Sequence, residues 1–141
     1  SCIAVATSKD LYHWDDHGPI MIVHRKKHPL QGPSGFEVPQ VVVRNGQYYI
    51  FVMDFWGLQY AVGDDPFHFG PWTVLGPWHA SYIFSDDRDR WYITSALRPF
   101  GKPSTKPPMS GPYRGLYMGG LVWSEGIPVP VDLGDVLNGR L

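Results

Sequence analysis

The sequence has almost no cysteine and almost no surplus charge. Cys2 is the only cysteine among 141 residues, so neither an internal disulfide nor a cysteine-based metal cluster can form. The chain has 12 Lys and Arg residues and 13 Asp and Glu residues, so its formal net charge is -1. This balance gives no basic surface for a phosphate backbone, so nucleic acid is not expected as a partner.

Long apolar runs and an initiator Met are also missing. The longest apolar runs, such as 40–43 and 48–53, have the length of strands and fall short of the roughly 20 residues that a membrane helix needs. We therefore expect a soluble protein with no membrane partner. The chain starts at Ser1 and shows none of the regions of a signal peptide, so we expect the natural start to lie upstream.

Aromatic residues, glycine and proline are abundant instead. The chain has 6 Trp, 8 Tyr and 7 Phe beside 16 Gly and 14 Pro, and 43% of its residues are hydrophobic, which is enough to build a core. Such a composition is typical of many short strands with aromatic packing and tight turns. It predicts an all-β fold without long helices.

Two hairpins can be read directly from the sequence. The clearer one spans 41–53, where Asn45-Gly46 supplies the positive φ values of a type I′ turn. The second spans 82–95, with the acidic turn 86–89 at its centre. Further strand signals lie at 3–7 and 20–23, and Pro-rich loops are expected at 26–35 and 98–112.

Two segments recur along the chain. Residues 91–93 (Trp-Tyr-Ile) occupy the place in the second hairpin that 48–50 (Tyr-Tyr-Ile) occupy in the first. Residues 60–69 line up with 5–14, including shared Ala, Asp and His positions, and 115–123 indicate a third unit. Both spacings are near the roughly 40 to 50 residues of a propeller blade, although they differ from each other.

These recurrences predict a β-propeller of four-stranded antiparallel blades. From composition alone, an open β-sandwich stays possible as the alternative. At about 45 residues per blade the chain holds about three blades, whereas closed propellers typically have about 4 to 8. We therefore predict an incomplete propeller over residues 1–141, with approximate blades at 1–35, 36–78 and 79–141.

Several motifs resemble those of a known family. Residues 8–14 (Ser-Lys-Asp-Leu-Tyr-His-Trp), followed by Gly-Pro at 18–19, resemble the blade signature of the five-bladed glycoside hydrolases of families 32, 43 and 68. Residues 36–40 (Phe-Glu-Val-Pro-Gln) look like the segment that carries the general-acid glutamate of family 32. Further matches follow in the expected order at 60–64, 78–81 and 115–128. The resemblance implies a five-bladed propeller of which this chain holds roughly the later three blades.

The resemblance makes Glu37 the candidate general acid. Glycoside hydrolysis needs a carboxylic acid that protonates the departing oxygen and a second carboxylate that acts as nucleophile or base. The apolar neighbours Phe36, Val38 and Pro39 are expected to desolvate the Glu37 carboxyl group and keep it protonated near neutral pH. The alternative is a solvent-facing glutamate beside a strand.

The partner carboxylates are expected to be missing from this chain. In the families that it resembles, the nucleophile or base Asp and a stabilising Asp come from blades before the first signature seen here. Asp10 is interpreted as a turn cap, and Asp15 and Asp16 as residues of a solvated turn. We therefore predict little or no activity for the isolated chain.

Three further residues are candidates for substrate binding. Asp54 and Trp56 follow a predicted strand, where they can contact a sugar, or instead cap the strand and pack between blades. His79 lies in a Trp-His-Ala-Ser stretch that resembles the start of a blade's innermost strand, and its alternative is a packed histidine. His24 and His28 have no carboxylates at ligand spacing, so no metal site is predicted, and no cofactor is expected.

Two functions are consistent with these features. The first is a glycoside hydrolase-like module acting on fructan, arabinan or related furanosides, with an oligo- or polysaccharide as its partner. It would need missing blades or a second chain to close the propeller. The second is a non-catalytic carbohydrate-binding or scaffold propeller, and a protein-interaction propeller ranks behind both. The resemblance favours an extracellular or periplasmic location.

Overall fold

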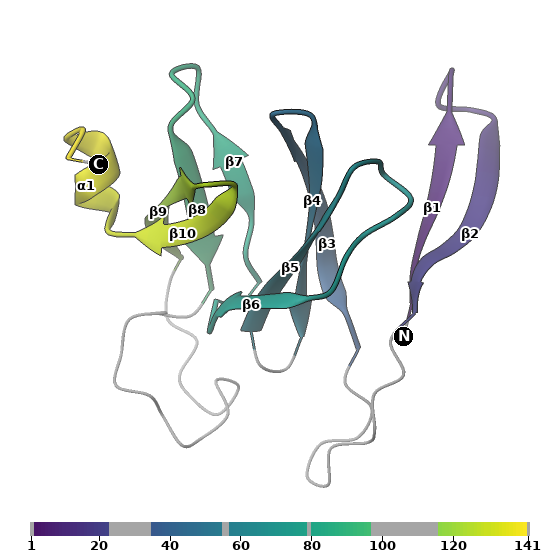
Figure 1. Ribbon diagram of the computed structural model, residues 1–141, viewed down its shortest axis with the longest axis horizontal. Coiled ribbons are helices and arrows are strands. Elements are labelled where there is room, and N and C mark those ends of the chain that lie inside the picture. The colour runs from purple at the N-terminus through teal and green to yellow at the C-terminus, as the bar shows by residue number, and fades with distance from the viewer. Residues whose placement is uncertain (1, 23–34, 55–56, 79, 97–115, 141) are drawn as a thin grey trace, which may run out of the picture.

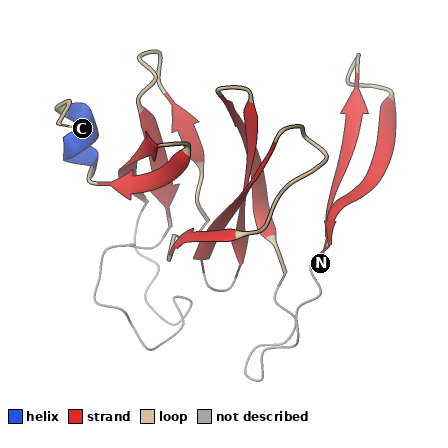
Figure 2. Cartoon of the chain, viewed as in Figure 1, coloured by secondary structure: helices blue, strands red, loops and turns tan. Residues whose placement is uncertain are grey.

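The protein is built almost entirely of β-strands, which confirms the predicted all-β class (Figure 2). The computed structural model describes residues 2–22, 35–54, 57–78, 80–96 and 116–140. The strands, in chain order, are β1 (Cys2–Ser8), β2 (Trp14–Ile22), β3 (Glu37–Arg44), β4 (Gln47–Asp54), β5 (Gly57–Gly63), β6 (Thr73–Gly76), β7 (Ile83–Ser85), β8 (Trp91–Ser95), β9 (Tyr117–Ser124) and β10 (Ile127–Val131). A short helix, α1 (Leu133–Leu137), follows β10.

The strands in the described ranges form three antiparallel sheets. β1 and β2 form a two-stranded hairpin, whereas β3–β6 and β7–β10 form four-stranded sheets in which strands that follow each other in the chain are neighbours. Figure 1 shows the three sheets side by side, with the β1–β2 hairpin at one end and α1 at the other. The predicted ranges 1–35, 36–78 and 79–141 each enclose one sheet, and in none of the three do the described strands close on themselves.

Both predicted hairpins are present. The β3–β4 turn has φ of 50° at Asn45 and 78° at Gly46, as a type I′ turn requires, and Glu125 and Gly126 repeat this geometry between β9 and β10. The predicted hairpin 82–95 consists of β7 and β8. The predicted Pro-rich loops lie almost entirely outside the described residues.

The second strand of the chain begins earlier than predicted. β2 starts at Trp14 and not near residue 20, so Asp15 and Asp16 lie in a strand rather than in a turn. They pair with Thr7 and Ala6 of β1, and both aspartates are exposed. The hydrogen bonds between paired strands use backbone groups only. A strand with one face in water can therefore carry carboxylate side chains on that face.

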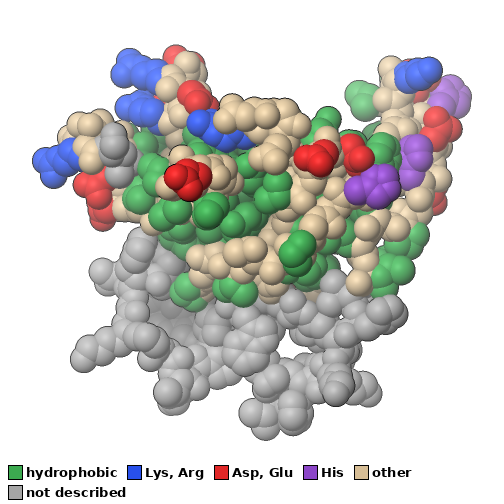
Figure 3. All heavy atoms as spheres, in the orientation of Figure 1, with side chains coloured by type: hydrophobic (Ala, Val, Ile, Leu, Met, Phe, Trp, Pro, Cys, Tyr) green, Lys and Arg blue, Asp and Glu red, His purple; other side chains and the backbone are tan. Residues whose placement is uncertain are grey.

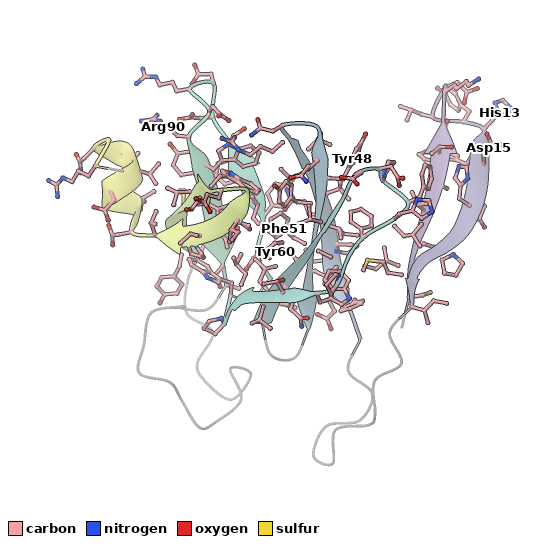
Figure 4. All side chains as sticks on the ribbon, viewed as in Figure 1. His13, Asp15, Tyr48, Phe51, Tyr60 and Arg90 are labelled. Atoms are coloured by element: carbon pink, nitrogen blue, oxygen red, sulfur yellow. The ribbon has the colours of Figure 1, made fainter. Side chains whose placement is uncertain are left out.

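The β3–β6 sheet is the middle layer of the molecule. On one face, Phe51 and Tyr60 lie side by side with ring centroids 5.9 Å apart, in one cluster with Ile93 of the β7–β10 sheet (Figure 4). On the other face, Ile50 belongs to a second cluster against which Ile3 of β1 packs. The core therefore lies on both faces of β4. Burying each such side chain contributes about 1.5–3 kcal/mol to the stability of the fold.

The helix α1 covers part of the outer face of the β7–β10 sheet. Asp132 caps the helix by accepting a hydrogen bond from the Gly134 N–H at 2.7 Å. Val136 packs against Gly120 of β9, where an added Cβ would lie 2.1 Å from a Val136 methyl carbon. Gly120 is therefore needed for the close approach of the helix to the sheet.

Candidate functional site

Glu37 lies at the start of β3, where the backbone departs from regular strand geometry. It pairs with Met53 of β4, and the ladder shifts register between Glu37 and Gln40. Val38, inside this bulge, has φ of 51°, which is an outlier for a β-branched residue. Bulges and strained residues of this kind occur preferentially next to functional sites, where they redirect a side chain.

The start of β3 is fixed to the neighbouring sheet by Gln40. Its Oε1 accepts a hydrogen bond from the Ile83 N–H at 2.8 Å, and its Nε2 donates to the Ile83 carbonyl oxygen. The amide thus replaces a strand partner for one residue of β7. The first strands of the two four-stranded sheets are therefore held side by side.

The approach to β7 repeats the strained geometry of the approach to β3. Ala80 has φ of 46° and lies three residues before β7, and Val38 lies two residues before Gln40, where the regular pairing of β3 resumes. The Ala80 N–H lies 2.9 Å from the Met53 sulfur, and Met53 is the ladder partner of Glu37. The two strained segments therefore meet around Met53, at one end of the β3–β6 sheet.

A buried hydroxyl group lies beside this point. Ser81 is 3% exposed, and its Oγ has no hydrogen-bond partner within the part of the chain that the structure describes. A buried polar atom normally has a partner, because leaving it unpaired costs about 1–3 kcal/mol. In the sequence, Ser81 stood out only as part of the Trp-His-Ala-Ser stretch.

Two of the predicted site residues come to the same end of this sheet. Glu37 pairs with Met53, and Asp54 is the next residue of β4, where it pairs with Gly57. Trp56 and His79 lie outside the described residues. The structure thus brings the backbones of Glu37 and Asp54 together, as a shared site requires.

The predicted desolvation of Glu37 is wrong. Glu37, Val38 and Pro39 are all exposed, with Val38 at 44%. Only Phe36 is half-buried, where its ring lies 4.8 Å from that of Trp72. The bulge turns the segment outward, so apolar neighbours in the sequence do not enclose the carboxylate. It makes no ion pair or hydrogen bond to the described residues.

Asp10 is a turn cap, as predicted. Its Oδ1 accepts hydrogen bonds from the N–H groups of Tyr12 at 2.9 Å and His13 at 2.8 Å, and the His13 Nδ1 lies 2.7 Å from its Oδ2. The His13 ring, followed by these N–H groups, holds the pKa of Asp10 well below its usual range. Figure 4 shows His13 and Asp15 at the tip of the β1–β2 hairpin.

A shallow depression lies at the opposite end of the β3–β6 sheet. Its volume is about 530 Å³, and it lies where Gly63 of β5 pairs with Tyr48, at the other end of β4 from Met53. In Figure 3, acidic and histidine side chains gather near this end of the molecule. The depression is lined by Gln47, Val62, Gly63, Asp64, Asp65, His68, Phe69 and Gly70.

Other kinds of site find little support in the described ranges. No group of three or more His, Cys, Asp and Glu side chains in them is arranged to hold a metal ion. No helix in them is long and apolar enough to cross a membrane.

No protein-family model, curated protein or solved structure matches the chain. The resemblance to glycoside hydrolases therefore remains a prediction.

Proposed function

We propose that this chain supplies blades of a five-bladed β-propeller glycoside hydrolase module that acts on fructan, arabinan or related furanosides. Two four-stranded sheets, each a run of consecutive antiparallel strands, pack face to face, which is how propeller blades are arranged. Gln40 joins their first strands. In a propeller these would be the strands that line the central axis.

Glu37 is the general acid in this proposal. The observation that carries it is the strained bulge at the start of β3, which presents Glu37 at the end of the sheet where Asp54 also lies. The second carboxylate of the pair, the nucleophile or base, is supplied from outside this chain. Carbohydrate, as an oligo- or polysaccharide, is the partner.

The exposure of Glu37 favours a second candidate, a non-catalytic carbohydrate-binding propeller. An exposed carboxylate is accessible to sugar hydroxyl groups, from which it can accept hydrogen bonds. In this case Glu37 holds the sugar and no bond is cleaved.

Sugar binding by the purified chain tests what both candidates share. Fructo- and arabino-oligosaccharides would be titrated into the wild type and into Glu37→Ala and followed by NMR. We expect Glu37→Ala to weaken binding by about tenfold, because one hydrogen bond to a charged group is lost. Glu125→Ala is the matched control, since Glu125 is the other glutamate and lies exposed in the β9–β10 turn. Equal affinities of all variants would contradict a role for Glu37.

Turnover separates the two candidates. The isolated chain should hydrolyse aryl furanosides far below ordinary enzyme rates, and an ordinary rate would show that the missing carboxylate had been assigned wrongly. In a protein that contains these residues together with the partner carboxylate, Glu37→Gln should keep sugar affinity and lose turnover, most severely for poor leaving groups. A binding module shows no turnover with either residue.

A further inference from the structure

The β1–β2 hairpin is a structural repeat of β5–β6. In the loop after β5, the Asp65 Oδ1 accepts hydrogen bonds from the N–H groups of Phe67 at 2.8 Å and His68 at 2.9 Å, and the His68 Nδ1 lies 2.9 Å from its Oδ2. Asp10 makes the same three contacts with residues two and three positions further on. The two loops therefore place β1 and β5 in equivalent positions.

The two equivalent strands differ at one edge. β5 pairs with β6 on one side, and on the other side every residue of β5 pairs with β4. β1 pairs with β2, and its second edge has no strand partner among the described residues. It is seven residues long and contains neither proline nor a charged side chain, two of the usual protections of a free edge. Its pairing with β2 shifts register on both sides of Ala4, so the edge is twisted there but not blocked.

We propose that the free edge of β1 binds an antiparallel β-hairpin with the side-chain pattern of β3–β4. The partner strand takes the place relative to β1 that β4 takes relative to β5. Gly57 and Ala61 of β5 correspond to Cys2 and Ala6 of β1. Gly57 pairs with Asp54 and Ala61 pairs with Ile50, so the equivalents of Asp54 and Ile50 in the partner strand should lie opposite Cys2 and Ala6. The inference depends on the repeat alone and holds whether or not the protein acts on sugars.

The side chains of β1 suit such a partner. Ile3 and Met21 are half-buried against the cluster that contains Ile50 and Val52. An added strand with apolar residues at alternate positions would extend this layer. The opposite face of β1 carries the small exposed side chains of Cys2, Ala4 and Ala6, which leave space for larger neighbours.

The single cysteine of the chain allows a test of both the binding and the register. A synthetic peptide with residues 37–54, carrying Asp54→Cys, would place its thiol across the ladder from the exposed Cys2. In a glutathione redox buffer, this peptide should form a disulfide with the protein about tenfold faster than a Gln47→Cys peptide, whose thiol lies at the far end of the strand. Equal rates for the two peptides would overturn the proposed register.

Hydrogen exchange supplies a second measurement that does not depend on the cysteine. The unmodified peptide should slow amide exchange in residues 2–8, and an Ile50→Pro peptide should not, because proline interrupts the ladder. Three outcomes would overturn the proposal: no protection of β1, loss of protection in β5 as the peptide replaces β3–β4, or dimers of the chain joined through β1 that exclude the peptide.

Discussion

β1 and β5 share a repeated sequence and the same turn after the strand, and yet they differ in how deeply they are packed. Leu58 of β5 is 2% exposed, and the three residues after it are also buried. Ile3, its counterpart in β1, is half-buried, and Ala4 and Ala6 are exposed. The local chemistry of the two segments is thus nearly the same, whereas their surroundings are not.

The difference separates two contributions to the fold. The aspartate-histidine turns depend on residues two and three positions apart, so they form wherever the motif occurs. Burial depends on neighbours that are distant in the chain: β5 lies between β4 and β6, and its Leu58 and Tyr60 also pack against the β7–β10 sheet. The turn therefore determines where the chain reverses, and the flanking sheets determine how much the strand stabilises the protein.

The largest expected effect is the difference in the free energy of unfolding between Leu58→Ala and Ile3→Ala. Leu58→Ala leaves a cavity between two sheets and should lower the free energy of unfolding by about 3 kcal/mol. Ile3→Ala removes a half-buried side chain and should cost about 1 kcal/mol. Urea denaturation of both variants measures the difference. Equal losses would mean that β1 is packed as tightly as β5, and the comparison would fail.

Gln40 links the two four-stranded sheets by its hydrogen bonds to Ile83, and the described residues of the β1–β2 hairpin show no equivalent glutamine contact to the β3–β6 sheet. Gln40→Ala would leave the N–H and carbonyl groups of Ile83 without their partner, and we expect a loss of about 1–3 kcal/mol in the free energy of unfolding. Gln47→Ala is the control, because the hydrogen bond that Gln47 accepts within the described residues comes from Tyr49 of its own hairpin. If both variants unfold at the same urea concentration, Gln40 does not hold the sheets together.

The same division explains what the sequence could predict. The Asn45-Gly46 hairpin, the Asp10 cap and the recurrence of 48–50 at 91–93 all follow from residues that are close in sequence, and all were correct. The start of β2 was missed because Asp15 and Asp16 look like turn residues, and only pairing with β1 makes them part of a strand.

The candidate site was predictable to the same extent. The motif singled out Glu37 as the candidate general acid, with a solvent-facing glutamate beside a strand as the alternative, and the structure puts it, exposed, at the first residue of β3. The exposure of Glu37 depends on the bulge at Val38, and the contact of Gln40 with Ile83 depends on packing between sheets. Neither has a signal in local sequence, because each is decided by residues that are far apart in the chain.

The third prediction concerns the backbone strain at the starts of β3 and β7. Strained residues persist only where the surrounding packing holds them. Glycine adopts positive φ without steric cost, so Val38→Gly should raise the free energy of unfolding by about 1 kcal/mol. Ala80→Gly should give a similar or smaller gain. Thermal unfolding measures the change, and a loss of stability in Val38→Gly would show that the side chain contributes more than the strain costs. A gain accompanied by weaker sugar binding would link the strain to the orientation of Glu37.

The smallest effect concerns the two equivalent turns themselves. The His68 ring, followed by the Phe67 N–H, lowers the pKa of Asp65, just as the His13 ring lowers the pKa of Asp10. A carboxylate whose pKa is lower in the folded than in the unfolded state stabilises the fold at pH values above the unfolded value of about 3.9, and this contribution is lost as the pH falls through the lowered folded pKa.

Both turns should therefore resist mild acid and loosen only below the unfolded value of about 3.9, which NMR titration of the two carboxyl carbons can follow. His13→Ala and His68→Ala should each raise the pKa of the aspartate in the same turn and leave that of the other turn unchanged, because the main contribution comes from within the turn. A response in both turns to either variant would show that they are coupled through the packing between β1–β2 and the β3–β6 sheet. The turn would then no longer be independent of its surroundings, and the separation of local turn chemistry from packing between sheets would fail.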